Sequence, residues 1–245
     1  METVLITGAA RRLGSLTAEK LAAEGCFVWI HYRTHEQEAF ELRDRIRYSG
    51  GQADCIRADL ADIGEIDSML DRLAGSANGQ LTTLINNASI FPRGTLKSQT
   101  PEEWDQVMNV NLKAVWYLSK GFSVRFADAK RIISIGDASV AAGFRDHAAY
   151  GLSKFGLKYL TQQMAAAFAP GIRVNLLSPG YVLPGDNEPE SIWQTRTGRT
   201  LTDNGNIADA VVRGVEFLMS DPGMTGTELI IDNGLQIFCK NGILK

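Results

Sequence analysis

Short apolar runs alternate with longer amphipathic runs along the whole of this 245-residue chain. Each apolar run is continuous and ends at Gly, Asn or Asp, which is typical of strands buried on both faces of a parallel sheet. We expect strands at 3–7, 27–32, 53–57, 82–87, 131–135, 172–177 and 228–232, and helices at 14–24, 35–49, 62–76, 102–127, 148–169 and 207–219. Such alternation implies parallel pairing with right-handed crossovers, so helices should cover both faces of one doubly wound sheet.

The composition suits a single domain over residues 1–245, an α/β fold of the Rossmann type with about seven parallel strands. Hydrophobic residues make up 44% and charged residues 22% of the chain, which is ordinary for a protein with a packed core. The net charge of −3 gives no reason to expect nucleic acid or an anionic membrane as a partner.

The sequence also predicts a reducing, aqueous environment. No apolar run approaches the length of a membrane span, and the N-terminus enters its first strand without a basic segment or a cleavage-like site. The cysteines, Cys26, Cys55 and Cys239, lie far apart and lack metal-ligand or C-x-x-C spacing. We therefore expect reduced thiols, no metal site and a cytoplasmic location.

The longest irregular stretch, residues 178–200, contains Pro179, Pro184 and Pro189. A loop of this length in a compact domain usually has a function, often as a lid. We expect it to border the substrate.

A tyrosine and a lysine lie four residues apart in the expected helix 148–169. Tyr150 and Lys154 should therefore leave the same helix face one turn apart. The ammonium should lower the pKa of Tyr150 by favouring the phenolate, and such a phenol can give a proton to a reacting group. Asp137 follows the strand 131–135 and precedes Tyr150 by thirteen residues. A surface Tyr–Lys pair is the alternative, since this spacing alone is common.

The turn after the first strand runs from Thr7 through Gly8 to Gly14. Glycines between a strand and a helix let backbone N–H groups approach a pyrophosphate at the helix N-terminus. We expect this turn to bind a dinucleotide; a tight turn without a ligand is the alternative.

Basic and hydroxyl side chains follow the second strand, where NAD enzymes usually place an acid for the ribose 2′-hydroxyl. Arg33 and Thr34 suit a 2′-phosphate, because guanidinium binds phosphate in bidentate geometry. Arg11 can reach the same region, and Asp59 is placed to accept a hydrogen bond from the adenine amine. We therefore expect NADPH, with solvated side chains as the alternative.

Motifs from the first strand to the last together resemble the short-chain dehydrogenase/reductase family. They are Thr7-Gly8 with Gly14, Asp59-Leu60, Asn86-Asn87-Ala88, Asn109 with Asn111, Tyr150 with Lys154, and Ser178-Pro179-Gly180. The resemblance implies that Asn111 holds a proton-relay water. It also implies that Lys154 binds the nicotinamide ribose and activates Tyr150.

The resemblance further assigns a cofactor set and a substrate set. The cofactor set is Gly8, Arg11, Arg12, Leu13, Gly14, His31, Tyr32, Arg33, Thr34, Asp59, Leu60, Asn87, Ala88, Ser89, Tyr150, Lys154, Pro179 and Gly180. The substrate set is Arg12, Ser89, Phe91, Asp137 and Tyr150, and the catalytic set is Asp137, Tyr150, Lys154 and Asn111.

Two departures from the general family pattern point to one branch of it. The family has Gly or Ala where this chain has Arg12, and Ser where this chain has Asp137. Both changes occur together in the pteridine reductase branch, which the chain also resembles at His31-Tyr32 and at Phe91, where that branch has a phenylalanine that stacks on the pterin.

The chemistry of a pterin agrees with these residues. A pterin is a flat, electron-poor bicycle, so Phe91 on one face and a nicotinamide on the other would enclose it. Its reducible bonds are C=N, and a Tyr150–Asp137 pair can protonate the ring nitrogen, with Asp137 recharging or replacing the phenol. Two such acids titrate as one unit.

Three functions remain open at this stage. The first is an NADPH-dependent reductase of dihydropterins such as dihydrobiopterin, and of dihydrofolate. The second is an NADPH-dependent carbonyl reductase acting on a 3-oxoacyl group or a xenobiotic ketone, and the third is a redox-sensing module that binds NADP without catalysis. The resemblance implies a homotetramer, and helices 102–127 and 148–169 carry more apolar residues than one sheet face needs.

Overall fold

The chain folds around one parallel sheet. A computed structural model describes residues 1–78, 80–202 and 207–240. The strands are β1 (Thr3–Ile6), β2 (Phe27–Tyr32), β3 (Gln52–Arg57), β4 (Thr83–Asn86), β5 (Arg131–Ile135), β6 (Arg173–Pro179) and β7 (Glu228–Ile231). Their order is β3-β2-β1-β4-β5-β6-β7, which confirms the expected seven-stranded, doubly wound fold. The order reverses between β1 and β4, and ligands of such folds bind at this switch point, beyond the carboxyl ends of the strands.

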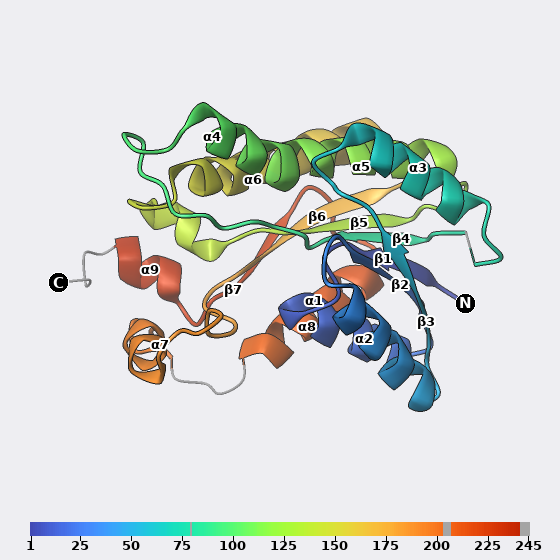
Figure 1. The fold of residues 1–245 in the computed structure, drawn as a ribbon, viewed down its shortest axis with the longest axis horizontal. Helices are drawn as coiled ribbons and strands as arrows, with labels where there is room; N and C mark the ends of the chain where they lie inside the picture. The colour runs from blue at the N-terminus through green and yellow to red at the C-terminus, as the bar shows by residue number, and fades with distance from the viewer. Residues whose placement is uncertain (79, 203–206, 241–245) are drawn as a thin grey trace.

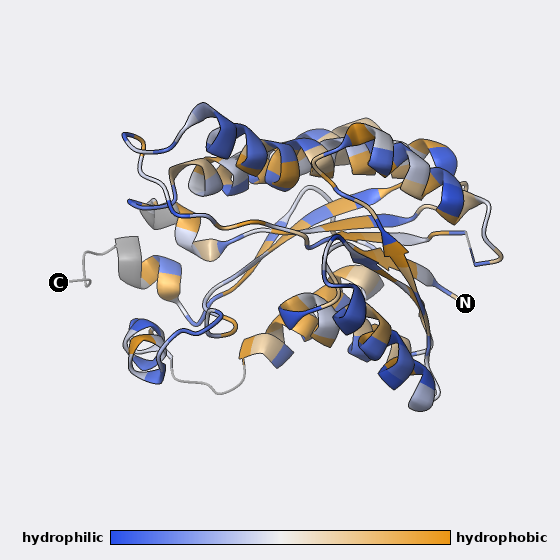
Figure 2. Ribbon diagram, viewed as in Figure 1, coloured by the Kyte–Doolittle hydropathy of each residue, from blue (hydrophilic) through white to orange (hydrophobic). Residues whose placement is uncertain are grey.

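Helices cover both faces of the sheet, as the alternating pattern predicts (Figure 1). One face carries α1 (Arg12–Ala23), α2 (Glu36–Tyr48) and α8 (Ile207–Ser220). The other carries α3 (Ile63–Ala74), α4 (Pro101–Met108), α5 (Ala114–Arg125) and α6 (Ala148–Phe168). In Figure 2 hydrophobic residues concentrate on the strands, while hydrophilic residues dominate the outer sides of the helices.

Each face of the sheet has its own core. Leu21 of α1 and Leu42 of α2 belong to a cluster on the first face, and Leu70 of α3, Phe122 of α5 and Leu157 of α6 belong to a cluster on the second. All five side chains are almost fully buried. Burial of one such side chain is worth about 1.5–3 kcal/mol, so the two clusters hold the helices firmly on the sheet.

The structure differs from the sequence prediction in four segments. The single helix expected at 102–127 is divided by a π-helical turn over Asn109–Lys113. A 3-10 turn over Ala138–Ala142 follows β5, and α7 (Glu190–Thr197) lies within the stretch expected as a loop. A last helix, α9 (Leu235–Lys240), follows β7. These segments lie beyond the carboxyl ends of strands or interrupt a helix, so they do not alter the sheet.

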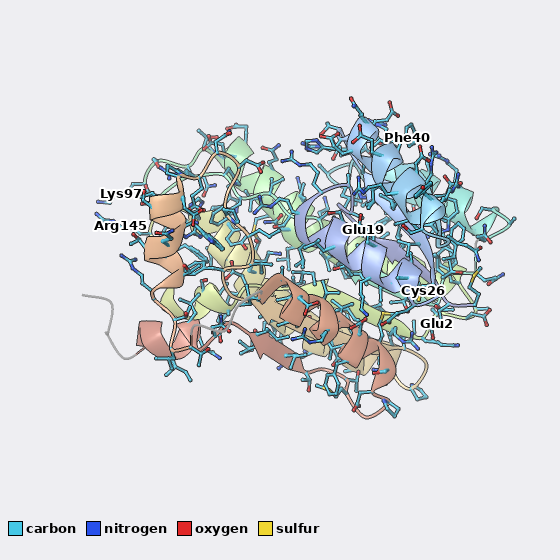
Figure 3. All side chains as sticks on the ribbon, turned by 90° about the horizontal axis from the view of Figure 1, so that it is seen from below. Glu2, Glu19, Cys26, Phe40, Lys97 and Arg145 are labelled. Atoms are coloured by element: carbon cyan, nitrogen blue, oxygen red, sulfur yellow. The ribbon has the colours of Figure 1, made fainter. Side chains whose placement is uncertain are left out.

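The two ends of the sheet differ in what they carry. Glu2 and Cys26 directly precede β1 and β2, and Figure 3 shows them at one end of the molecule. Lys97 and Arg145, from the segments after β4 and β5, lie at the opposite end. The segments that follow the strands therefore gather at one end, which is where the site is built.

Two remaining expectations concern the cysteines and the membrane. Cys26 and Cys55 are free thiols, and burial raises the pKa of both, that of Cys55 to about 11. The side chain of Cys239 lies outside the described part of the chain. Within residues 1–78, 80–202 and 207–240, no helix has the length and apolar character needed to cross a bilayer.

Candidate active site

A cavity of about 1270 Å³ lies beyond the carboxyl ends of the strands. Drug-sized ligands occupy sites of about 300–1,000 Å³, so this cavity has room for a dinucleotide beside a second small molecule. It is lined by every residue of the expected cofactor and substrate sets. Asn111 is the one member of the expected catalytic set that does not line it.

The floor of the cavity at its cofactor end is the turn between β1 and α1. Gly8 has φ of 61°, a left-handed conformation that glycine adopts without strain. A Cβ added at Gly14 would lie 2.7 Å from the carbonyl oxygen of Gly8 and 2.7 Å from Nδ2 of Asn87. Only glycine fits here, and the turn brings the N-terminus of α1, where backbone N–H groups suit a phosphate, to the wall of the cavity.

Side chains from neighbouring strands hold this turn in place. Nδ2 of Asn87 donates to the carbonyl oxygens of Thr7 (2.8 Å) and Gly8 (3.0 Å), and the hydroxyl of Thr7 accepts from the backbone N–H groups of Asn87 and Ala88. Asn87 and Ala88 thus reach the cavity from the end of β4, as expected. The side chain of Asn87 also stabilises the turn through its hydrogen bonds to Thr7 and Gly8, a role that the sequence did not predict.

The side chain of His31 stabilises the same turn through a hydrogen bond to Gly8. It is buried, and its Nδ1 accepts from the backbone N–H of Gly8 at 3.0 Å, while Nε2 lies 3.1 Å from the carbonyl oxygen of Ala58. Burial lowers the pKa of His31 to about 4, so the ring is neutral at physiological pH and Nε2 carries the proton. His31 therefore positions the turn rather than pairing with a phosphate charge.

Arg33 and Thr34 lie after β2 at the rim of the cavity. Nη1 of Arg33 is 3.9 Å from Oδ2 of Asp59, whose Oδ1 accepts from the backbone N–H of Ala61 at 2.9 Å. The Arg33 side chain is 41% exposed, so it remains accessible to a ligand. The guanidinium of Arg33 and the hydroxyl of Thr34 both line the cavity here, and donors of this kind suit a ribose 2′-phosphate.

Replacing Arg33 by aspartate should remove the preference for NADPH over NADH. A hydrogen bond to a charged group is worth about 1.5–3 kcal/mol, which corresponds to about 10- to 100-fold in affinity, and the new carboxylate would also repel the 2′-phosphate. Steady-state kcat/KM with each cofactor measures the change. Equal kcat/KM for NADPH and NADH in the unaltered protein would contradict this role for Arg33.

Arg11 and Arg12 turn toward the loop that follows β6. Nη2 of Arg11 is 3.0 Å from Oδ2 of Asp186, and Nη1 of Arg12 is 3.2 Å from Oδ1 of the same residue. Arg12 has φ of 58°, a left-handed conformation that costs a non-glycine residue about 1–2 kcal/mol. The guanidinium of Arg11, expected near the 2′-phosphate, therefore has a loop carboxylate as its partner.

Tyr150, Asp137 and Lys154 meet at the centre of the cavity. The hydroxyl of Tyr150 donates to Oδ2 of Asp137 at 2.7 Å, and Oδ1 of Asp137 accepts from the backbone N–H of Ser139 at 2.7 Å. Asp137 caps the 3-10 turn, so the carboxylate is held in one orientation. The sequence predicted that Tyr150 and Asp137 act as a pair, and here they are joined by a direct hydrogen bond.

The prediction that Lys154 lowers the pKa of Tyr150 is wrong for this structure. Burial, and then the charge and hydrogen bond of Asp137, raise the pKa of Tyr150 well above its usual value. Nζ of Lys154 does not reach the phenol oxygen; it donates to the carbonyl oxygen of Ile135 at 2.7 Å and lies 5.8 Å from the centre of the Tyr150 ring. Tyr150 is therefore a neutral proton donor paired to a carboxylate.

Lys154 is itself nearly removed from water, with 5% of its surface exposed. Burial lowers its pKa to about 8, against the charge of Asp137, which raises it. An ammonium has three N–H donors, and one is used by Ile135. Lys154 lines the cavity, so its other two donors can bind the hydroxyls of a sugar.

Asn111 lies behind the cavity, within the π-helical turn. Its Nδ2 donates to the carbonyl oxygen of Ile90 at 2.9 Å, and its Oδ1 accepts from the N–H of Ile90 at 2.9 Å. Nδ2 also lies 3.3 Å from the hydroxyl of Ser153 on α6. This fully buried amide fixes the segment that carries Ser89 and Phe91, and π turns often occur at functional sites.

Aromatic side chains form the substrate end of the cavity. The ring of Phe91 stacks on His147 with 3.7 Å between ring centres, and meets Tyr150 edge-on at 4.4 Å. Phe144 contacts Phe91 edge-on at 6.0 Å. Sequence reasoning found Phe91 but missed Phe144 and His147; the position of His147, one helical turn before Tyr150, was the available signal.

The loop after β6 closes the cavity. Nη1 of Arg196 donates to Oε1 of Glu188 at 2.7 Å, and its guanidinium lies 4.6 Å from the centre of the Tyr181 ring. Oε2 of Glu188 accepts from the N–H of Gly185 at 2.8 Å. The expected substrate loop is therefore an ordered unit that includes α7, and its individual residues could not be identified without the fold.

Comparison with known proteins finds related oxidoreductases that match most of the chain. A family model described as enoyl-(acyl carrier protein) reductase matches residues 8–236. The 3-oxoacyl-[acyl-carrier-protein] reductase FabG of Escherichia coli is 32% identical over 243 residues, which cover 94% of this chain and 96% of that protein.

Two solved structures with a similar fold contain bound NADP. A short chain dehydrogenase from Burkholderia cenocepacia in complex with NADP has a TM-score of 0.86 and 32% identity, covering 96% of this chain and 97% of the other. FolM alternative dihydrofolate reductase 1 from Brucella canis, complexed with NADP, has a TM-score of 0.85 and 29% identity, with 96% and 94% covered.

Proposed function

The chain belongs to the short-chain dehydrogenase/reductase family, and on this basis we propose that it is an NADPH-dependent reductase of pterins. Its substrates would be dihydropterins such as dihydrobiopterin, together with dihydrofolate. The substrate would lie between Phe91 and the nicotinamide, with Tyr150 and Asp137 delivering the proton.

The residues at the cofactor end fit NADPH. The turn from Gly8 to Gly14 lines the cavity at the N-terminus of α1, where a pyrophosphate would bind, and Arg33 with Thr34 offers donors for the 2′-phosphate at the rim. Buried Lys154 offers donors to the nicotinamide ribose. NADPH would supply the hydride when bound, and relatives solved with NADP support this choice.

One observation supports the pterin assignment above the others: the 2.7 Å hydrogen bond from Tyr150 to Asp137. An imine nitrogen accepts a proton more readily than a ketone oxygen, and a carboxylic acid is a stronger donor than a phenol. Protonation of Asp137 would reverse this hydrogen bond, so that the carboxyl group donates to the phenol oxygen. The phenol would then be free to donate to a ring nitrogen of the substrate.

The aromatic end of the cavity also suits a flat bicyclic ring. Phe91 is about half exposed, and a planar ligand can stack on the face that His147 does not cover, or take the place of His147. Arg12 lies between the cofactor end and the loop and supplies donors to polar groups of either ligand. The similarity to an alternative dihydrofolate reductase favours the same class of substrate.

A second function is carbonyl reduction. The relative FabG of Escherichia coli is a 3-oxoacyl reductase, and Tyr150 with Lys154 would serve a ketone as well as an imine. Asp137 distinguishes the two functions, because a carboxylate that raises the pKa of the phenol gives no advantage in protonating an alkoxide. A sensor without catalysis would not need the buried Tyr150–Lys154 pair.

The experiment that tests the proposal follows NADPH absorbance at equal enzyme concentration with dihydrobiopterin, dihydrofolate and a 3-oxoacyl thioester. We expect oxidation of NADPH with at least one of the two pterin compounds, and a kcat/KM for it well above that for the thioester. Turnover of the thioester without turnover of either pterin would instead establish carbonyl reduction.

We also propose that the protein is a homotetramer. Exposed apolar side chains gather on α5 and α6, where Phe155 is 65% and Tyr159 64% exposed and Trp116 and Leu152 are also exposed. Two such helices packed against their symmetry mates would cover these side chains in an isologous interface. Light scattering at micromolar concentration should give four times the chain mass of 26.8 kDa; a monomer mass would contradict the proposal.

A further inference from the structure

Asp186 joins the substrate loop to both arginines of the cofactor turn. Its two carboxylate oxygens lie 3.0 Å from Nη2 of Arg11 and 3.2 Å from Nη1 of Arg12. Arg12 also donates to the carbonyl oxygen of Leu183 at 3.4 Å. These contacts span more than 170 residues of sequence and connect the loop after β1 with the loop after β6.

The loop is internally ordered without Asp186. Glu188 accepts from Gly185 and from Arg196, and Arg196 lies over Tyr181. These contacts hold Tyr181–Arg196 together as one body that lines the cavity. Asp186, by contrast, points away from these contacts toward Arg11 and Arg12. Its ion pairs therefore determine the position of the segment Tyr181–Arg196 relative to the cofactor turn, and not the internal structure of that segment.

The arginines keep donors for a phosphate while they hold Asp186. A guanidinium has five N–H donors, and Asp186 takes one from each. Two cations against one carboxylate leave a net positive charge at the cofactor turn. Arg12 has a left-handed backbone conformation, which is uncommon for a residue other than glycine. From this position its guanidinium contacts Asp186 and Leu183 of the loop after β6.

We propose that Asp186 is a positioning residue that fastens the wall of the substrate cavity to the cofactor turn. Through Arg11 and Arg12, it sets how closely the segment from Tyr181 to Arg196 approaches the substrate. The expected consequence is a substrate affinity that depends on Asp186, with cofactor affinity and the chemical step little affected. This consequence for the substrate rests on the proposed pterin reductase function, whereas the docking of the loop does not.

The first experiment needs no substrate. Hydrogen exchange is measured on Asp186→Asn, on Asp186→Glu and on Glu190→Gln, which removes an equal charge from the same loop without touching either arginine. We expect faster exchange of amides in 181–189 for Asp186→Asn alone, with Asp186→Glu close to the unaltered protein. Unchanged exchange in Asp186→Asn would overturn the docking role whatever the substrate is.

The second experiment uses NADPH and dihydrobiopterin, which is uncharged and so adds no salt dependence of its own. Exposed ion pairs are individually weak and screened by salt, so Asp186→Asn should raise KM by about 3- to 10-fold at low ionic strength. Its kcat and its Kd for NADPH should stay within about threefold of the unaltered protein, and added salt should raise KM less than in that protein.

Two results would overturn the proposal for the substrate. One is a KM that does not change while exchange in 181–189 rises, because the loop would then move without consequence. The other is a larger change in the Kd for NADPH than in KM, which would make Asp186 a competitor of the cofactor phosphates. Absence of any turnover of dihydrobiopterin by the unaltered protein would count against the proposed function and leave the exchange result standing.

Discussion

Replacing Tyr150 by phenylalanine should lower kcat by about 10²- to 10⁴-fold, the range of one positioned general acid. The phenol joins Asp137 to the reacting atoms, since its hydroxyl donates to the Asp137 carboxylate at 2.7 Å. Phenylalanine keeps the ring that packs against Phe91 and Phe144, so the cavity should keep its shape. Single-turnover rates with saturating NADPH would measure the loss.

The control for this change is Tyr159→Phe. Tyr159 lies on the same helix, is 64% exposed and does not line the cavity, so the same loss of a hydroxyl should leave kcat unchanged. NADPH should bind equally well to the unaltered protein, to Tyr150→Phe and to Tyr159→Phe. The Tyr150 hydroxyl is expected to stabilise the transition state and not the bound cofactor. Near-normal turnover by Tyr150→Phe would mean that Asp137 or a water delivers the proton directly.

Replacing Asp137 by serine should lower turnover of a dihydropterin by roughly 100-fold, again the scale of one general acid, and leave NADPH binding intact. Serine is also a good N-cap, so the 3-10 turn that begins after Asp137 should persist. Loss of the carboxylate removes two of the causes that raise the pKa of Tyr150. The phenol should therefore serve a ketone at least as well as before, and kcat measured with both substrates would show the divergence.

Asp137→Asn separates proton delivery from geometry. The amide keeps nearly the same shape but has no acidic proton. Its one oxygen can still accept from the N–H of Ser139, which Oδ1 of Asp137 binds here, while its NH2 group would take the place of Oδ2 and donate to the phenol oxygen. We expect it to lose as much pterin turnover as the serine variant. If Asp137→Asn retained turnover, Asp137 would only orient the phenol, and the argument that favours an imine over a ketone would fail.

The fold could be predicted because its pattern is local. Each buried strand is a continuous apolar run, and the turn from Thr7 to Gly14 requires glycine for reasons that apply in any parallel α/β protein. The position of several site residues could be predicted for a similar reason. The carboxyl ends of parallel strands lie at one edge of the sheet, so Asp59, Asn87 and Asp137, which follow β3, β4 and β5, lie at the same edge.

Contacts between distant segments could not be predicted in the same way. The pKa of Tyr150 depends on which of two neighbours its hydroxyl meets, and helical spacing alone favoured Lys154 over Asp137. The stacking of His147 on Phe91 and the reach of Asp186 to Arg11 depend on how the segments after β4, β5 and β6 fold back. The π turn at Asn109–Lys113 contains Asn111, whose hydrogen bonds to Ile90 are long-range contacts that no helical pattern reveals.

The central claim is that the hydride is transferred to a C=N bond of a pterin ring. The most direct measurement uses NADPH carrying deuterium at both C4 positions of the nicotinamide, with a 7,8-dihydropterin and a 3-oxoacyl thioester present together, and analyses the products by mass spectrometry. We predict one deuterium on the tetrahydropterin, at the carbon of the former imine, and an unlabelled thioester pool. Deuterium on the carbinol carbon of a 3-hydroxyacyl thioester, with no label in the pterin, would contradict the account and establish a carbonyl reductase.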